Sequence, residues 1–347
     1  MRATPASLAA RAAALLLSLA AAVPAAAGRA AQAAPPLPAQ APPGPPPPSP
    51  PAAPEDAGER LSRIEQAMWD RDPKAVPLLR EWAAADPSDR VRERSVGALA
   101  IVRDAEAGPV LAARLAGDPA AAVRRAAAEA IGLLRDAAAA GRLAEALLAD
   151  SDPFVRAECA RALGRIGGAG QQPALVVAVI RDPSPEVRAL AAGALVAARA
   201  ADAADVLRAV AERDDAVLVR IYAVRGLAEI SPRSSAPLFR AAWRDASDPE
   251  LRLEAFRGLL AAEPGEAWER AGLADADDRV RFLAFQAWLS RAVESRRGAD
   301  GLPDDFAGRL AAFLEDRVGG IRELARAQLE SLGVKVRPSG FGYAVER

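Results

Sequence analysis

A valine–arginine pair recurs along this chain at a nearly fixed interval. The first six copies are spaced 32 residues apart, and the last two follow after 29 and 41 residues. In chain order the copies are Val91-Arg92, Val123-Arg124, Val155-Arg156, Val187-Arg188, Val219-Arg220, Leu251-Arg252, Val280-Arg281 and Ile321-Arg322. A fixed period of this length is typical of proteins in which one supersecondary unit stacks on the next. The sequence therefore predicts an array of eight units.

Each unit carries two columns of apolar residues. The first residue of each pair is large. The residue four positions after it is small in every unit, and the residue eight positions after it is large. A large–small–large series at this spacing forms one buried stripe of a helix. A second column lies twelve residues before the pair: Leu79, Leu111, Leu143, Leu175, Leu207, Phe239 and Trp268. This column indicates a preceding helix, so we expect an all-α fold, an α-solenoid of about eight helical hairpins.

An aspartate stands five residues before the pair in seven of the eight units. The sixth unit has Ala246 instead. In Asp86-Pro87, Asp118-Pro119 and Asp182-Pro183 the order predicts Asp as the N-cap and Pro as the first residue of the second helix. A catalytic acid is needed once, whereas a cap is needed in every unit. The recurrent aspartates are therefore predicted to be structural.

The pattern Asp-x4-Val-Arg-x2-Ala-x2-Ala-Leu resembles the HEAT repeat, especially the short bacterial form related to phycobilin-lyase-type repeats. The resemblance covers about Lys74 to Leu332. It implies a right-handed superhelix whose second helices line a concave face. It also implies a ladder of hydrogen bonds between Asp and Arg of adjacent units, formed by Asp86, Arg92, Asp118, Arg124, Asp150, Arg156, Asp182, Arg188, Asp214 and Arg220.

The N-terminal residues 1–27 are expected to be a cleaved secretory signal. Arg2 and Arg11 precede an apolar run of about 12 residues, and small residues follow at Ala25–Ala27. A membrane span needs ~20 apolar residues, so this run is short for one. An uncleaved membrane anchor is the alternative. The first reading places the protein in the periplasm or outside the cell, and the second places it at the inner membrane.

The remaining segments are assigned from composition. Residues 28–54 are rich in Pro and Ala, which predicts a polyproline spacer, with a docking ligand as the alternative. Residues 55–72 suit an N-terminal capping helix, and 73–332 form the solenoid. An insertion at 291–305 is predicted to be a surface loop. The tail, 333–347, has some strand character and is either disordered or folded back on the last unit.

Composition excludes several kinds of site. The chain has no histidine, which removes Ser-His-Asp and Cys-His catalysis and nearly every zinc site. Its single cysteine, Cys159, occupies a small buried slot of the repeat, as expected for a core residue. The 45 basic and 46 acidic residues are balanced, which argues against a general nucleic-acid binder. No cofactor or metal is predicted.

One departure from the repeat predicts a binding surface. Two residues after the start of the pair, units five to seven carry large apolar side chains. They are edged by polar residues four positions further along. The predicted partner-binding residues are Ile221, Tyr222, Arg225, Leu253, Arg257, Phe282 and Gln286. The alternative is that the apolar members belong to the core.

These observations favour an exported, non-catalytic scaffold that binds a protein partner along its concave face. A membrane-anchored adaptor is the first alternative. The second is an enzyme similar to the phycobilin lyases, although the residues that carry the resemblance are the structural ones.

Overall fold

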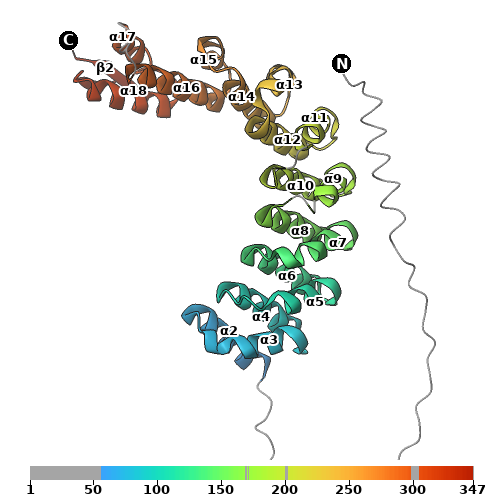
Figure 1. The fold of residues 1–347 in the computed structure, drawn as a ribbon. Helices are drawn as coiled ribbons and strands as arrows, with labels where there is room; N and C mark the ends of the chain where they lie inside the picture. Colours follow the sequence, from blue (N-terminus) through green and yellow to red (C-terminus); the bar gives the residue numbers. More distant parts are fainter. Residues whose placement is uncertain (1–55, 169, 171, 200–201, 298–304, 347) are drawn as a thin grey trace, which may run out of the picture. The chain divides into compact units, whose positions relative to one another are not determined.

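The computed structural model describes residues 56–346 except 169, 171, 200–201 and 298–304. The predicted signal segment and the Pro/Ala-rich linker lie outside the described residues. Within these ranges the chain forms seventeen α-helices, α2 to α18, and one two-stranded hairpin (Figure 1). None of the described helices is both long enough and apolar enough to cross a membrane.

Eight helical hairpins follow one another, which confirms the predicted all-α solenoid. The handedness of the superhelix stays a prediction. The hairpins are α3 (Val76–Ala85) with α4 (Asp89–Ile101), α5 (Gly108–Gly117) with α6 (Ala121–Leu134), α7 (Ala140–Ala149) with α8 (Pro153–Ile166), α9 (Gln172–Arg181) with α10 (Pro185–Ala197), α11 (Ala203–Arg213) with α12 (Val217–Ile230), α13 (Pro232–Asp245) with α14 (Pro249–Ala262), α15 (Glu266–Leu273) with α16 (Asp278–Arg297), and α17 (Phe306–Ala311) with α18 (Gly319–Ser331). Short 3₁₀ helices, Pro73–Ala75 and Ala137–Ala139, precede α3 and α7.

The second helix of each hairpin packs on the second helix of the next. From α4 to α14 these helices are direct neighbours, and Figure 1 shows α4, α6, α8 and α10 along one side with the first helices along the other. Small residues permit the close approach. A Cβ atom added at Gly132 would lie 2.8 Å from Ala162, and one added at Gly164 would lie 3.1 Å from Ala194. Packing therefore leaves no room for a side chain at Gly132 and little at Gly164.

The core is divided into two clusters. The larger one runs from α2 to the start of α16 and is mostly aliphatic in its first five units. It includes Cys159, whose burial raises the pKa of the thiol above its ordinary value. The smaller cluster joins α16, α17 and α18, and it contains Phe285, Trp288 and Phe306. The array is thus aliphatic at one end and aromatic at the other.

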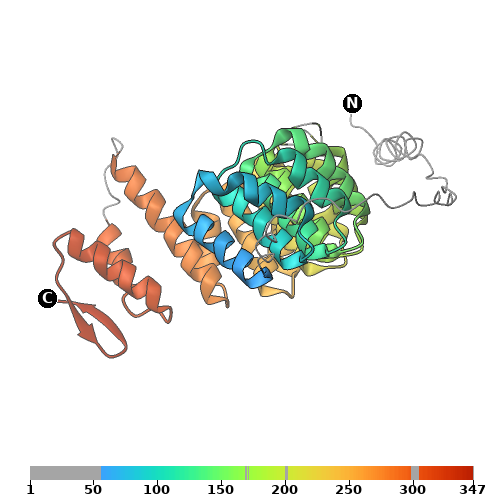
Figure 2. The same ribbon diagram turned by 90° about the horizontal axis from the view of Figure 1, so that it is seen from below.

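Each end of the array is covered by an element outside the hairpins. At the N-terminal end, α2 (Ala57–Asp70) begins with a capping box between Asp56 and Glu59 and buries Ile64. At the other end, β1 (Val336–Ser339) pairs antiparallel with β2 (Gly342–Val345) beside α18 (Figure 2). The N–H of Tyr343 donates to the carbonyl of Leu314 at 3.1 Å. The tail is therefore folded back on the last unit.

The predicted surface loop at 291–305 is wrong for its first part. Helix α16 continues through these residues to Arg297, and 298–304 lie outside the described residues. The reason is that the segment holds good helix formers and no Gly or Pro before Gly298. Arg291 also ties the extension to α15, donating to both carboxylate oxygens of Glu269 at 2.8 and 2.7 Å.

The predicted N-caps are also wrong, by two residues. Asp86 and Asp118 are the C-caps of α3 and α5, and the N-caps of the following helices are Ser88 and Ala120. The carboxylate of Asp86 accepts the N–H of Ser88 at 2.9 Å, so it closes the turn between the helices. An Asp that bonds to the N–H two residues on forms such a turn as readily as it caps a helix.

Candidate protein-binding face

The Asp–Arg ladder is built from one arrangement repeated along the first five units. The guanidinium of Arg92 donates from Nε and Nη2 to the two carboxylate oxygens of Asp118, at 2.8 and 2.9 Å. Its Nη1 donates to the carbonyl of Asp86, in its own unit, at 2.8 Å. Each arginine therefore links two consecutive turns. The same bidentate pairs are Arg124–Asp150, Arg156–Asp182 and Arg188–Asp214.

The ladder begins one step earlier than the repeat pattern indicates. Arg60 of the capping helix pairs with Asp86, with Nε and Oδ2 2.8 Å apart. Sequence reasoning missed this residue, although the signal is present. Arg60 precedes Asp86 by 26 residues, the same separation as Arg92 from Asp118. The capping helix therefore continues the internal bonding of the array as well as covering its end.

The ladder is interrupted between units five and six. Ala246 occupies the position where Arg220 would find its carboxylate. Among the described residues, the buried Nε of Arg220 has no hydrogen-bond partner. The structure thus brings every predicted ladder residue into a pair except Arg220.

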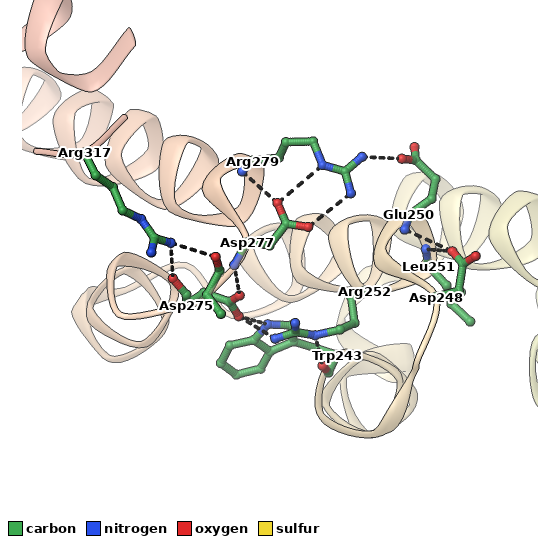
Figure 3. A network of polar contacts seen from close by, with 10 residues as sticks. Trp243, Asp248, Glu250, Leu251, Arg252, Asp275, Asp277, Arg279 and Arg317 are labelled. Atoms are coloured by element: carbon green, nitrogen blue, oxygen red, sulfur yellow. Dashed lines mark hydrogen bonds and ion pairs between the residues drawn. The ribbon is translucent and has the colours of Figure 1, made fainter. Parts of the chain in front are cut away.

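Units six to eight use a different polar network (Figure 3). Arg252 donates to the carbonyl of Trp243 at 2.9 Å and to Asp275 Oδ2 at 2.6 Å. The indole N–H of Trp243 donates to the same oxygen at 3.1 Å. Arg279 bridges Glu250 and Asp277 at 2.8 and 3.1 Å. The arginine–aspartate pair is therefore kept at this junction, and Trp243 adds a donor to the aspartate and an acceptor for the arginine.

Three of the ladder carboxylates, Asp118, Asp150 and Asp214, have lowered pKa values. Burial alone would raise the pKa of Asp118, but the hydrogen bonds from Arg92 and from the N–H of Ala120 hold that pKa below its ordinary value. The pKa values of Asp150 and Asp214 are lowered by the same balance. The acidic residues that recur with the period are therefore engaged in structural contacts.

The predicted apolar ridge is wrong for two of its three members. Ile221 and Leu253 are only 7% and 8% exposed, and Phe282 is partly buried with its ring against Gly320. The equivalent residues Ala157 and Ala189 are buried too. In units three to seven the residues two, five and nine positions after the start of the pair are apolar or glycine, and they form a second stripe on the helix. This stripe faces the neighbouring second helix, so Ile221 and Leu253 belong to the core.

The other predicted residues do lie at the surface of the second helices. Arg225, Arg257 and Gln286 are exposed, and Tyr222 is half-buried beside Gly193 of the preceding unit. The guanidinium carbon of Arg225 lies 5.5 Å from the centre of the Tyr222 ring. We call this surface the second-helix face, formed by the residues three and six positions after the start of each pair on α6 to α16.

Two buried glutamates on this face were missed by sequence reasoning. Glu254 accepts from Arg225 Nη2 at 2.9 Å and has Arg257 Nη1 at 3.9 Å. Glu158 is paired with Arg161, and Arg165 Nη1 lies 3.4 Å from its Oε1. The one available signal is that both glutamates stand at the same repeat position, three residues after the start of the pair.

Burial gives Glu158 a distinct electrostatic character. It raises the pKa of this carboxyl above its ordinary value, against the opposing effect of Arg161. Among the described residues, no three His, Cys, Asp or Glu side chains are arranged to hold a metal ion. The face therefore offers guanidinium groups and an aromatic ring, which suit recognition of another macromolecule.

Several solved structures are similar to this chain. The complex of CpcE and CpcF of phycocyanin lyase from Nostoc sp. PCC7120 is 21% identical, with a TM-score of 0.38, over 69% of this chain and 91% of that one. The E. coli protein YibA is 19% identical, with a TM-score of 0.49, over 67% and 87%. Human deoxyhypusine hydroxylase in complex with glycerol is 22% identical, with a TM-score of 0.30, over 66% and 94%. No curated protein matches the chain.

The family comparison covers more than half of the sequence. The model for HEAT repeats matches residues 60–132, 109–178, 141–218 and 172–260. These ranges span the ladder from Arg60 to its interruption and the hairpins that carry it. With its stacked helical hairpins and its Asp–Arg ladder, this chain belongs to the HEAT-repeat family.

Proposed function

We propose that this protein is an exported, non-catalytic scaffold that binds a protein partner along its second-helix face. One observation carries the proposal. The ladder residues repeat and are paired internally, whereas the second-helix face differs from unit to unit and keeps guanidinium groups at the surface. Repeat arrays of this kind commonly bind proteins along one extended face.

The non-catalytic part of the proposal is supported by the residues that could otherwise carry chemistry. The recurrent aspartates are paired with arginines, and the Cys159 thiol is buried with a raised pKa. A thiol in that state is a poor nucleophile. Titration with a bilin should therefore leave its absorption spectrum unchanged. A spectral shift on mixing would instead favour the lyase-like alternative.

Export is proposed from residues 1–27 of the sequence, with their basic start, apolar run and small residues. N-terminal sequencing of the protein from cells tests it. A chain that begins after Ala27, or after the second small-residue site Ala31-Gln32-Ala33, supports a cleaved signal. A chain that retains the apolar run in the membrane fraction supports the anchored adaptor.

The binding face can be tested by site-specific photo-cross-linking in cells that produce the full chain. A photoreactive residue is placed at Glu129 or Gln286 on the second-helix face, or at Arg142 or Arg270 on the first helices. All four positions are exposed. We expect protein adducts at Glu129 and Gln286 and none at the first-helix positions. Adducts confined to Arg142 and Arg270 would refute the proposal.

A further inference from the structure

We infer that the middle of the second-helix face binds an acidic segment of the partner protein. Two arginine clusters would receive its carboxylates, one on α8 and one shared by α12 and α14. The segment between them would lie across the uncharged surface of α10. This inference rests on the proposed function and specifies the chemistry of the partner.

The first cluster converges from two adjacent units. Arg225 of α12 and Arg257 of α14 both approach Glu254 Oε1, at 2.9 and 3.9 Å. The side chain of Glu254 is 3% exposed, while the two arginines are 49% and 54% exposed. Two guanidinium groups thus share one buried carboxylate. Their remaining N–H groups face outward and can bind a further carboxylate.

Glu254 offers a second contact to a bound chain. Its Oε2 is buried and accepts no hydrogen bond within the described residues. A buried acceptor without a donor costs free energy, which a ligand can recover. An acidic peptide supplies both needs, because its carboxylates draw the arginines outward and its backbone N–H can donate to Oε2.

The second cluster has the same composition, and its buried glutamate lies three units earlier. Arg161 and Arg165 of α8 approach the buried Glu158, and both keep part of their side chains exposed, at 46% and 35%. Again two positive charges share one negative charge. The raised pKa of Glu158 weakens that neutralisation further as the pH falls. Each cluster therefore keeps an excess of positive charge toward solvent.

Helix α10 lies between the clusters and carries no charge on this face. Its residues there are Leu190 and Gly193, and the ring of Tyr222 lies 3.7 Å from where a Cβ on Gly193 would stand. Neighbouring packed helices are about 8–10 Å apart, so α8 and α12 are separated by roughly 16–20 Å. An extended chain spans that distance in about five or six residues. The fitting segment has two acidic groups that far apart with apolar residues between them.

The arrangement favours an acidic protein over a nucleic acid. A nucleic acid presents one phosphate after another and needs a continuous basic surface. Here the two clusters are separated by an uncharged helix, and the whole chain has nearly equal numbers of basic and acidic residues. A single-stranded oligonucleotide is therefore the appropriate competing probe.

Fluorescence anisotropy with the full chain tests the inference. The probe is a labelled peptide with two glutamates, five alternating alanines and leucines, and two more glutamates. We expect Arg225→Gln/Arg257→Gln to weaken its binding by about tenfold, the loss of one or two charge-assisted contacts. The matched control Arg142→Gln/Arg270→Gln has the same charge change on the first helices and should change binding less than about twofold.

Three further arms keep the result interpretable. Arg161→Gln/Arg165→Gln should weaken binding similarly, which covers the case in which the first variant does not fold. A peptide with glutamine in place of glutamate should not bind, and one with a single spacer residue should bind more weakly. Equal binding by all variants, or tighter binding of the oligonucleotide, would overturn the inference. If cross-links still form at Glu129 and Gln286 in that case, the proposed function stands without it.

Discussion

The first five units and the last three are held together by different means. From Arg60 to Asp214, each junction has the same bidentate pair between an arginine and the aspartate of the next unit. After Ala246 that pair is absent once and is then rebuilt with Trp243 as an added donor. The regular region repeats one solution, whereas the irregular region has a separate solution at each junction.

The cores differ in the same way. In the regular region the buried side chains are mainly Val, Leu, Ile and Ala. In the irregular region Trp243 packs against Phe256 and Trp268, with ring centres 5.3 and 5.9 Å apart. Phe285 and Phe313 follow at 4.8 Å. Aromatic rings have specific pairing geometries, so a core built from them tolerates less exchange than a core of aliphatic residues.

The array therefore continues past a lost ladder pair. Where the period fails, larger side chains and individually placed polar contacts hold the junction. We therefore expect a substitution in the irregular region to destabilise only the neighbouring units. In the regular region, removing any one ladder pair should lower the free energy of unfolding by a similar amount.

Phe256→Ala should have the largest effect. Phe256 is fully buried, and its ring approaches Gly272 so closely that a Cβ there would lie 2.2 Å from Cζ. Removing the ring should lower the free energy of unfolding by about 3–5 kcal/mol. Hydrogen exchange should show lost protection in α13 to α16 while α4 to α10 keep theirs. An equal loss of hydrogen-exchange protection along the whole array would show that the two regions unfold together.

Asp118→Ala should be the next largest. The Asp118 side chain is fully buried, and removal leaves Arg92, itself only 10% exposed, without its carboxylate. Breaking a buried pair in this way costs about 3 kcal/mol. Asp215→Ala is the matched control, because Asp215 contacts Arg188 but is 90% exposed and should matter little. If the urea unfolding midpoint of Asp118→Ala were unchanged, the ladder would not be what stabilises the regular region.

Much of this organisation could be predicted from the sequence. The buried stripe that begins at each Val-Arg pair placed the hairpins correctly, and residues such as Val91 and Leu99 are fully buried. A single stripe was not enough, however. Each second helix touches its own first helix and also neighbouring second helices. Ile221, on the opposite side of a helical wheel, is therefore buried as well.

The rest depended on three-dimensional contacts that no local pattern records. The turn position of Asp86 and the N-cap position of Ser88 are both common uses of a short polar side chain, so the sequence did not decide between them. Glu254 is buried and pairs with Arg225, which comes from the preceding unit. A charged residue in a charge-rich helix gives no sign of such a partner.

Ala246→Asp should restore the missing ladder pair and make the irregular region more like the regular one. The new carboxylate would face Arg220, whose Nε has no partner among the described residues. We expect a gain of about 1 kcal/mol in the free energy of unfolding, because the pair is partly open to water. Ala246→Asn is the control, since it can close the turn but carries no charge. A gain that persists in an Arg220→Ala background would show that no such pair had formed.

Glu158→Gln should have the smallest effect and is distinguished by its pH dependence. Glu158 lies in the regular region but outside the ladder, and its raised pKa means that the folded state disfavours its charge. That cost is fully present above the folded pKa and is lost as the pH falls toward ~4.3, the unfolded value. At pH 7 the free energy of unfolding of the Gln variant should therefore match that of the wild type to within about 0.5 kcal/mol, and the wild type should become more stable relative to it on acidification.

Asp118→Asn must show the opposite trend. Its lowered pKa gives the wild type an advantage above ~3.9, and this advantage disappears as the pH falls through the folded value. Parallel urea titrations of the two variants between pH 7 and pH 3 test the pair of slopes. If both variants changed in the same direction, Asp118 would not differ electrostatically from Glu158.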